Sequence, residues 1–109
     1  MERFVKGDVV IVEFPFSDLS SNKKRPAIVI SPIAGSEYLL CQITSRTYAS
    51  NEEIPLKLND FIKGRISRDS FVRYTKLFTS KNTLIHYQAG KLKQEKVKEI
   101  TDKISSFIS

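Results

Sequence analysis

The spacing of the apolar residues changes once along this sequence, near residue 90. Before that point the apolar residues form short β-branched runs or alternate with polar ones, as they do in strands. After it they recur at helical spacing, at Leu92, Val97, Ile100, Ile104 and Phe107. A chain of 109 residues has room for one hydrophobic core. The sequence therefore predicts a single domain, residues 1–109, in which short strands precede one amphipathic helix.

Six short segments are predicted to be strands: residues 9–14, 27–30, 37–44, 54–58, 70–74 and 76–78. The second of them, residues 27–30, is apolar throughout, which suggests burial on both faces or in a barrel core. Pro55 places the fourth at the edge of a sheet, because proline cannot donate a ladder hydrogen bond. Polar loops are expected at residues 17–24 and 45–51. Short strands with turns about every 8–12 residues favour a small antiparallel barrel or sandwich, so the expected class is mainly β (α+β).

The chain carries a formal net charge of +6 at pH 7. A basic surface favours a polyanionic partner, most commonly nucleic acid, although many small domains are basic for solubility alone. The one cysteine, Cys41, lies in an apolar run and is interpreted as a buried small hydrophobe, which fits a reducing cytoplasm. No apolar stretch approaches the ~20 residues of a membrane span, and the N-terminus lacks a signal-peptide core. We therefore expect a cytoplasmic protein that binds no membrane.

The scarcity of some residue types excludes several kinds of catalysis. His86 is the single histidine, so a two-histidine acid–base ribonuclease is impossible within one subunit, and a packed or surface histidine is the favoured interpretation. One histidine and one cysteine, far apart, give no zinc pattern. The four glycines are scattered and form no phosphate-binding loop. We expect neither a metal nor another cofactor.

The arginine, lysine, serine and threonine residues that remain suit one reaction well, the cleavage of RNA by its own 2′-hydroxyl. The substrate supplies the nucleophile. The protein has only to align it, stabilise negative charge at phosphorus and help the 5′-oxygen leave. Arginine suits a phosphate because its planar fork donates two hydrogen bonds, and a hydroxyl can donate a third.

Positive charge is concentrated in two parts of the sequence. Arg25 follows Lys23 and Lys24. It stands beside Pro26, which fixes the backbone at a strand entrance, so a functional role is favoured over that of a solvated loop charge. The second part carries six basic residues, Lys63, Arg65, Arg68, Arg73, Lys76 and Lys81. With interleaved aromatic residues it could bind phosphates and stack bases, although strand alternation would split these side chains between two faces.

Several short motifs together resemble one known family. Gly7 and Asp8 open the first strand, and Arg25-Pro26 lead into the second. The other motifs are Gln42-Ile43-Thr44-Ser45 at the end of the third strand, a Gly-x-x-x-x-x-Ser-x-Val stretch from Gly64 to Val72, and Gly90-Lys91-Leu92 before the helix. They resemble motifs of the MazF/PemK family of type II toxin–antitoxin endoribonucleases. The resemblance covers nearly the whole chain.

The resemblance implies an SH3-like small β-barrel with a C-terminal α-helix, acting as a homodimer. It implies metal-independent cleavage of single-stranded RNA (mRNA) at short sequences, which leaves 2′,3′-cyclic phosphate and 5′-hydroxyl ends and thereby inhibits translation and growth. It also implies a cognate antitoxin, unless the chain is a solitary member, and that antitoxin would neutralise the toxin by placing an acidic or amphipathic tail in the basic groove.

The family's catalytic arginine and threonine fall on Arg25 and Thr44, and the threonine is chosen on the resemblance alone. Neighbouring basic and hydroxyl residues are expected to bind the RNA, namely Lys23, Lys24, Ser45, Arg46, Ser70, Arg73 and Lys76. Many family members carry Gln-x-Arg-Thr-Ile-Asp after the serine, whereas residues 74–80 here lack that arginine and aspartate. This departure suits a PemK-like branch, with Lys76 as the basic residue of the segment.

Two alternatives belong to other functional classes. CcdB-like toxins share the fold but poison gyrase, and they end in Trp-Gly-Ile. This chain has no tryptophan and ends Ser106-Phe107-Ile108-Ser109. The other alternative is a non-catalytic barrel that binds RNA or protein.

Overall fold

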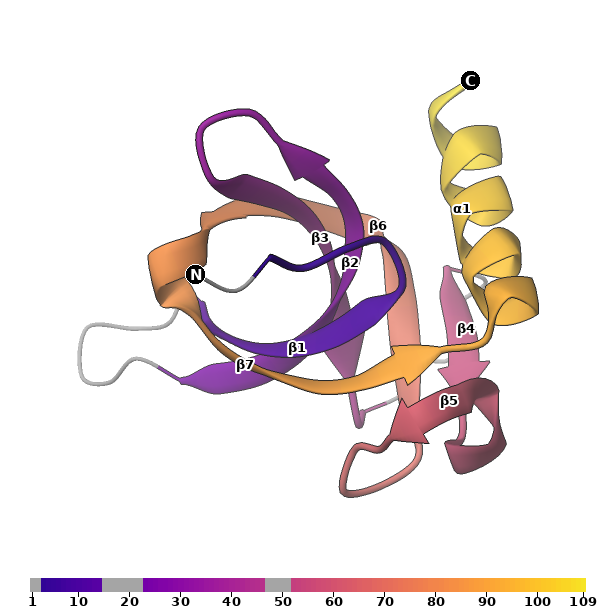
Figure 1. Cartoon of the computed structure of the whole chain (residues 1–109). Coiled ribbons are helices and arrows are strands. Elements are labelled where there is room, and N and C mark those ends of the chain that lie inside the picture. The colour runs from indigo at the N-terminus through magenta and orange to yellow at the C-terminus, as the bar shows by residue number, and fades with distance from the viewer. Residues whose placement is uncertain (1–2, 15–22, 47–51) are drawn as a thin grey trace.

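The computed structural model describes residues 3–14, 23–46 and 52–109, where a curled sheet lies beside a C-terminal helix (Figure 1). The strands are β1 (Asp8–Glu13), β2 (Lys24–Ile33), β3 (Glu37–Thr44), β4 (Glu53–Leu56), β5 (Phe61–Gly64), β6 (Ser70–Lys81) and β7 (Ile85–Leu92). The helices are α1 (Gln94–Ile108) and the short 3-10 helices η1 (Leu58–Asp60) and η2 (Asn82–Leu84). Of the two predicted loops, residues 17–22 and 47–51 lie outside the described residues.

The strands form one antiparallel sheet in the order β4-β6-β3-β2-β1-β7-β5. The predicted mainly β class with a C-terminal helix is therefore confirmed. The sheet curls round in Figure 1, but within the described residues its end strands do not pair with each other, so the barrel is open. Both end strands, β4 and β5, are only four residues long. Pro55 lies in the edge strand β4, as the sequence predicts.

β6 joins the two predicted segments at residues 70–74 and 76–78 into one strand. Between two successive residues of β3, the β6 partner changes from Leu77 to Arg73, which leaves residues 74–76 as a bulge. The extra residues change the direction of the strand locally. This bulge explains why the alternation of apolar and polar residues is interrupted there and why the sequence predicts two strands instead of one.

The other differences concern elements with a weak sequence pattern. β5 and β7 are absent from the predicted strands because their sequences mix glycine, lysine and single apolar residues. Leu92 ends β7 rather than beginning the helical stripe, and its side chain is buried in the core. Leu58 lies in η1 and is exposed, so it does not extend β4 as predicted.

Buried side chains gather in two clusters on opposite faces of the central strands. The first core cluster contains Val9, Ile28, Ile30, Cys41, Ile43, Ile54, Leu56, Phe61, Val72, Leu92, Ile100 and Ile104. The second core cluster contains Phe4, Val10, Val12, Phe14, Ala27, Val29, Tyr38, Leu40 and Ile85. Successive residues of β2 alternate between the two, because side chains of a strand alternate between faces. The predicted burial of residues 27–30 on both faces is confirmed.

The helix α1 covers the first core cluster with one side. Ile100 and Ile104 are buried there, so the predicted packing of the helical stripe on the sheet is confirmed for its middle. Phe107 is half exposed, with its ring edge-on to Tyr74 at a centroid distance of 6.3 Å. None of the helices in the described part of the chain has the length and apolarity that crossing a membrane requires.

Cys41 lies in the first core cluster, as predicted for a small buried hydrophobe. Its Sγ donates a hydrogen bond to the Arg73 carbonyl oxygen at 3.0 Å. Burial raises the pKa of the Cys41 thiol to about 12, so the thiol remains protonated at neutral pH. Its place in the core is therefore a packing role.

Gly7 fastens the start of β1 to two other strands through its backbone. Its N–H donates to the Val29 carbonyl of β2 at 2.9 Å, and its carbonyl accepts from the Leu92 N–H of β7 at 3.0 Å. Its φ of +95° is a conformation that favours glycine, and a Cβ there would lie 3.1 Å from a methyl carbon of Val97. Both facts explain why a glycine opens this strand.

Asp8 continues the same connection through its side chain, which is only 6% exposed. Its carboxylate accepts hydrogen bonds from the Val5 N–H at 2.9 Å, the Gln88 side-chain amide at 3.0 Å and the Lys91 ammonium at 3.2 Å. A nearly buried carboxylate is stable only when it is paired in this way. The Gly7-Asp8 motif is thus a structural device that joins β1, β2 and β7.

We predict that Asp8→Ala lowers the free energy of unfolding by about 2–3 kcal/mol, because it removes charge-assisted hydrogen bonds from a buried site. Asp102→Ala is the matched control, since Asp102 pairs with Lys98 on the helix surface where both side chains are well exposed. Loss of an exposed pair costs under about 1 kcal/mol. Urea unfolding of the three proteins measures both values. Equal losses in the two variants would contradict a special role for Asp8.

Candidate functional site

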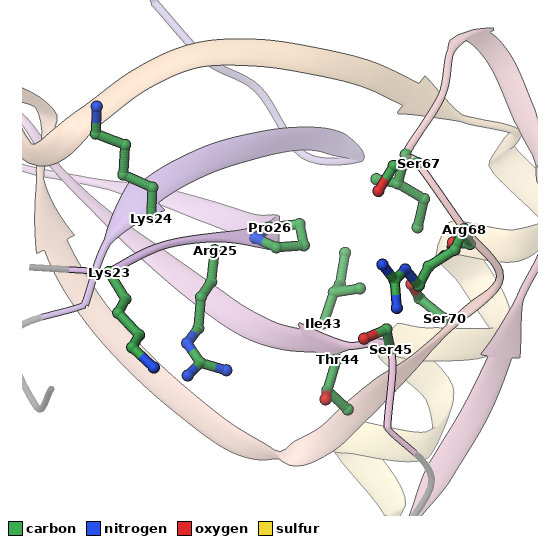
Figure 2. A pocket seen from close by; sticks show the side chains of 11 residues that line it. Lys23, Lys24, Arg25, Pro26, Ile43, Thr44, Ser45, Ser67, Arg68 and Ser70 are labelled. Atoms are coloured by element: carbon green, nitrogen blue, oxygen red, sulfur yellow. Dashed lines mark hydrogen bonds between the residues drawn. The ribbon is translucent and has the colours of Figure 1, made fainter.

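The predicted catalytic residues line one groove of about 380 Å³ (Figure 2). The groove lies where the start of β2, the end of β3 and the segment between β5 and β6 meet. Its lining residues are Lys23, Lys24, Arg25, Pro26, Ile43, Thr44, Ser45, Ile66, Ser67, Arg68 and Ser70. Six of the nine predicted site residues are among them, so segments separated by about twenty residues of sequence meet at this groove.

The groove opens where two neighbouring strands part. The pairing of β2 with β3 ends at Ala27 and Gln42, although β2 begins at Lys24 and β3 runs to Thr44. Beyond the last pair, side chains from both faces of the strands reach the same space. This divergence explains how Arg25 and its neighbour Pro26, which point to opposite faces, line one groove.

Arg25 is held on the exposed side of the second core cluster. It pairs with Val12 in the ladder between β1 and β2, and its guanidinium carbon lies 6.0 Å from the centre of the buried Phe14 ring. At this distance a cation is attracted to the face of an aromatic ring. Figure 2 shows Arg25 and Lys24 pointing to opposite sides of β2, as alternation requires.

Thr44 lies on the floor of the groove and is 9% exposed. Its Oγ1 accepts a hydrogen bond from the Arg46 N–H at 3.1 Å, which holds the bend that follows β3. A hydroxyl accepts and donates, so the hydrogen of Thr44 can still be donated to a ligand oxygen. Thr44 thus has a structural bond and retains the capacity that the predicted chemistry needs.

Ser70 also lies on the floor and is 4% exposed. Its hydroxyl donates to the Arg68 carbonyl at 3.0 Å, which closes the turn before β6. Its hydrogen is therefore used inside the protein, and its oxygen can still accept. Ser70 lines the groove as expected and shapes the segment that carries Arg68.

Arg68 and Ser67 are groove residues that the predicted site omits. They lie between β5 and β6, and Figure 2 shows the Arg68 guanidinium reaching into the groove beside Ser45 and Ser70. Arg68 belongs to the basic stretch of residues 63–81, but the sequence alone does not distinguish it from the other basic residues there. Arg68 lines the groove because the tertiary fold brings its segment next to the start of β2.

Two glycines fix the position of this segment. Gly64 pairs with Gly90 across β5 and β7, and the Arg65 N–H donates to the Ala89 carbonyl at 3.2 Å. Gly64 has a φ of +69°, and a Cβ on it would overlap the Ala89 carbonyl and the Gly90 backbone. Both glycines belong to the motifs found in the sequence. The position of the segment that carries Arg68 could therefore have been inferred from these glycines, but not from its basic residues.

Three predicted RNA-binding residues, Arg46, Arg73 and Lys76, do not line the groove. Arg73 is half buried in β6, opposite Gln42 and Glu53. Lys76 lies in the bulge of β6. Their contacts with RNA stay a prediction.

The charge of the groove has one sign. Four of its lining residues are cations, Lys23, Lys24, Arg25 and Arg68, and none of the described lining residues is acidic. An exposed basic groove of this kind attracts phosphate groups.

His86 lies outside the groove, with its Nε2 at 2.8 Å from Glu13 Oε2. In the part of the chain that the structure describes, no three His, Cys, Asp or Glu side chains gather as metal ligands would.

Residues 5–108 match the sequence pattern of one family, the PemK-like, MazF-like toxins of type II toxin–antitoxin systems. The chain belongs to this family. The resemblance found in the short motifs is thereby confirmed over nearly the whole chain. Among curated proteins, none matches this family member in sequence.

Solved structures of similar proteins share the fold. A chain of the MazE–MazF structure from Deinococcus radiodurans has a TM-score of 0.76 at 19% identity, over 95% of this chain and 94% of that one. The Mycobacterium tuberculosis toxin MazF-mt6 has a TM-score of 0.71 at 14% identity, over 91% and 93%. A mycobacterial endoribonuclease solved with its cognate antitoxin has a TM-score of 0.76 at 9% identity, over 97% and 95%. At such identities these likenesses concern the fold.

We predict that Gly64→Ala destabilises the protein more than Gly35→Ala. Both glycines have positive φ, so each substitution introduces backbone strain of about 1–2 kcal/mol. A Cβ at Gly35 has no atom within 4 Å, whereas at Gly64 it overlaps the β7 backbone. Thermal unfolding should therefore show a melting temperature for Gly64→Ala several degrees below that of Gly35→Ala. Equal melting temperatures would show that β5 shifts away without cost.

Proposed function

We propose that this toxin-family member is a metal-independent endoribonuclease that cleaves single-stranded RNA, such as mRNA, at short sequences. The observation that carries the proposal is the convergence of Arg25 and Thr44 in one groove whose charged lining residues are all cations. Arg25 and Thr44 come from different strands, β2 and β3, and both match catalytic positions of the family that the motifs resemble. The mycobacterial neighbour named an endoribonuclease adds support from the same fold.

The proposed reaction uses the 2′-hydroxyl of the RNA as nucleophile. Its oxygen bonds to the adjacent phosphorus while the bond from phosphorus to the 5′-oxygen breaks. The 2′-proton passes to water and the leaving oxygen takes a proton from water. The products are a 2′,3′-cyclic phosphate and a 5′-hydroxyl. Water and the substrate supply every atom that moves, so the protein contributes alignment and charge.

Arg25 stabilises the negative charge that develops on the phosphate oxygens, because its guanidinium projects into the groove. An arginine is too basic to serve as the general base at neutral pH. Thr44 donates its hydroxyl hydrogen to a phosphate oxygen or to the leaving oxygen. Arg68 offers a second guanidinium from the facing side of the groove. Lys23, Lys24 and Ser45 hold the neighbouring RNA backbone.

The cellular role follows from this reaction. Cleavage of mRNA in the cytoplasm inhibits translation and growth, and a cognate antitoxin neutralises the toxin by laying an acidic or amphipathic tail in the basic groove. The toxin acts as a homodimer. Solved neighbours that contain an antitoxin support this partner.

We predict that the purified protein fragments a long single-stranded RNA in the presence of EDTA, and that Arg25→Ala lowers the rate about 100- to 1000-fold through lost charge stabilisation. Gel analysis of the RNA over time gives both rates. Arg3→Ala is the matched control, because Arg3 is an exposed arginine beside a different hollow, with Phe4 and Asn82, and should retain the wild-type rate. Intact RNA with the wild-type protein would instead favour a gyrase poison or a non-catalytic binding protein. A wild-type rate in Arg25→Ala would remove Arg25 from the mechanism.

We predict that RNA with a single 2′-deoxy substitution at the mapped cut site survives, because the nucleophile is missing. The matched substrate carries the 2′-deoxy substitution two nucleotides away and should be cut at the usual rate. Electrophoresis of both end-labelled RNAs, together with phosphatase treatment to identify cyclic phosphate ends, makes the comparison. Cleavage at the substituted site would show that another nucleophile attacks.

A further inference from the structure

A second hollow, of about 650 Å³, continues the groove. The two share four lining residues, Lys24, Pro26, Ile66 and Ser67. The second hollow adds Ile11, Arg65, Tyr87, Gln88 and Ala89, which come from β1, from the segment after β5 and from β7. A ligand that extended from the groove past Pro26 would therefore enter this space directly.

Three of the residues that line the second hollow form a row, which we call the shelf: Pro26, Ile11 and Tyr87. Ile11 is paired with Pro26 on one side and with Tyr87 on the other, so the three residues cross β2, β1 and β7 in line. Adjacent strands in a sheet lie about 4.8 Å apart, which places these side chains next to one another on one face. The Tyr87 side of the shelf is open, since Tyr87 is 55% exposed.

The shelf lies on the same face of β1 and β2 as the first core cluster, at the end of that face where the side chains are only partly covered. Two residues earlier on β1, Val9 pairs with Ile28, and both side chains are fully buried in the first core cluster. At Ile11 and Pro26 the same face is only partly covered. An apolar row that ends in an exposed aromatic ring, beside a basic groove, suits a ligand that combines flat rings with negative charge.

The edges of the shelf carry positive charge. Lys24 lines both hollows and points away from Arg25, and Arg65, next to Ile66 in the sequence, also lines the second hollow. None of the described residues that line the second hollow is acidic. Glu13, the ladder partner of Lys24, is paired with His86 at 2.8 Å. Cations at the edges of an aromatic platform are the arrangement that binds single-stranded nucleic acid.

We propose that the shelf is a subsite for a nucleotide flanking the scissile phosphate, with its base stacked on the Tyr87 ring and its phosphate between Lys24 and Arg65. This inference rests on the proposed ribonuclease function and adds to it a residue that binds substrate away from the reacting atoms. Stacking on an aromatic ring accepts any base, so the subsite contributes affinity more than sequence preference. It acts on substrate binding and leaves the chemical step unchanged.

The test compares Tyr87→Ala with Tyr87→Phe on a 12-nucleotide single-stranded RNA that carries the cut sequence mapped with the wild-type protein. Tyr87→Phe keeps the ring and should keep the wild-type KM. Tyr87→Ala should raise KM about five- to tenfold, the lower range of base stacking, with kcat unchanged. Since Tyr87 is exposed and makes no part of either core cluster, both variants should fold, which circular dichroism verifies.

Shortened RNAs complete the test. Removing nucleotides one at a time from each end should raise the wild-type KM at one step by the same factor, and the Tyr87→Ala protein should lose nothing further at that step. An unchanged KM in Tyr87→Ala while the wild type cleaves RNA would overturn the subsite alone. Additional loss in Tyr87→Ala on the shortened RNA would also overturn it, because the ring would then act elsewhere. Intact RNA with the wild-type protein in EDTA would instead overturn the ribonuclease function itself.

Discussion

The turn formed by Gly7 and Asp8 is the constraint on which the rest of the sheet depends, because it ties together strands that are far apart in the sequence. Its backbone bonds to β2 and to the end of β7, and its buried carboxylate bonds to two further β7 side chains. β1 lies between these two strands. One groove wall begins on β2, and the facing wall follows Gly64, which pairs with β7. A motif that lines no part of the groove therefore sets the separation of its walls.

The alternation of side chains along the central strands then gives the groove its two kinds of surface. Leu40 and Thr44 lie on the face of the second core cluster, as Arg25 does above Phe14. Pro26 lies on the opposite face, next to Ile11 and the first core cluster. Because β2 and β3 part at this end, Arg25 and Thr44 on one face and the apolar shelf on the other border connected space. A fully paired barrel would have kept them on separate sides of the sheet.

The sequence was sufficient for the parts of this arrangement that rest on local patterns. β3 has the predicted bounds, and Arg25, which stands at a strand entrance beside a proline, lines the groove. Thr44 also lines it, but only the family resemblance pointed to that residue. The parts that depend on tertiary contact were not predictable. β7 has no run of apolar residues, because one side of it faces solvent at Tyr87. Arg68 and Lys76 look equivalent in a basic stretch, and only the bulge of β6 and the glycine contact at β5 separate them.

The floor and the walls of the groove carry different groups, hydroxyls on the floor and cations on the walls. The floor hydroxyls already have structural bonds, since Thr44 accepts from the Arg46 backbone and Ser70 donates to the Arg68 carbonyl. Their positions are therefore fixed before a ligand arrives, which is the condition for electrostatic stabilisation of a transition state. The wall cations are exposed and come from separate parts of the sheet, so a phosphate between Arg25 and Arg68 would link the two walls. The proposed catalysis and the binding of an anion would then depend on the same geometry, which Gly64 and Gly90 fix.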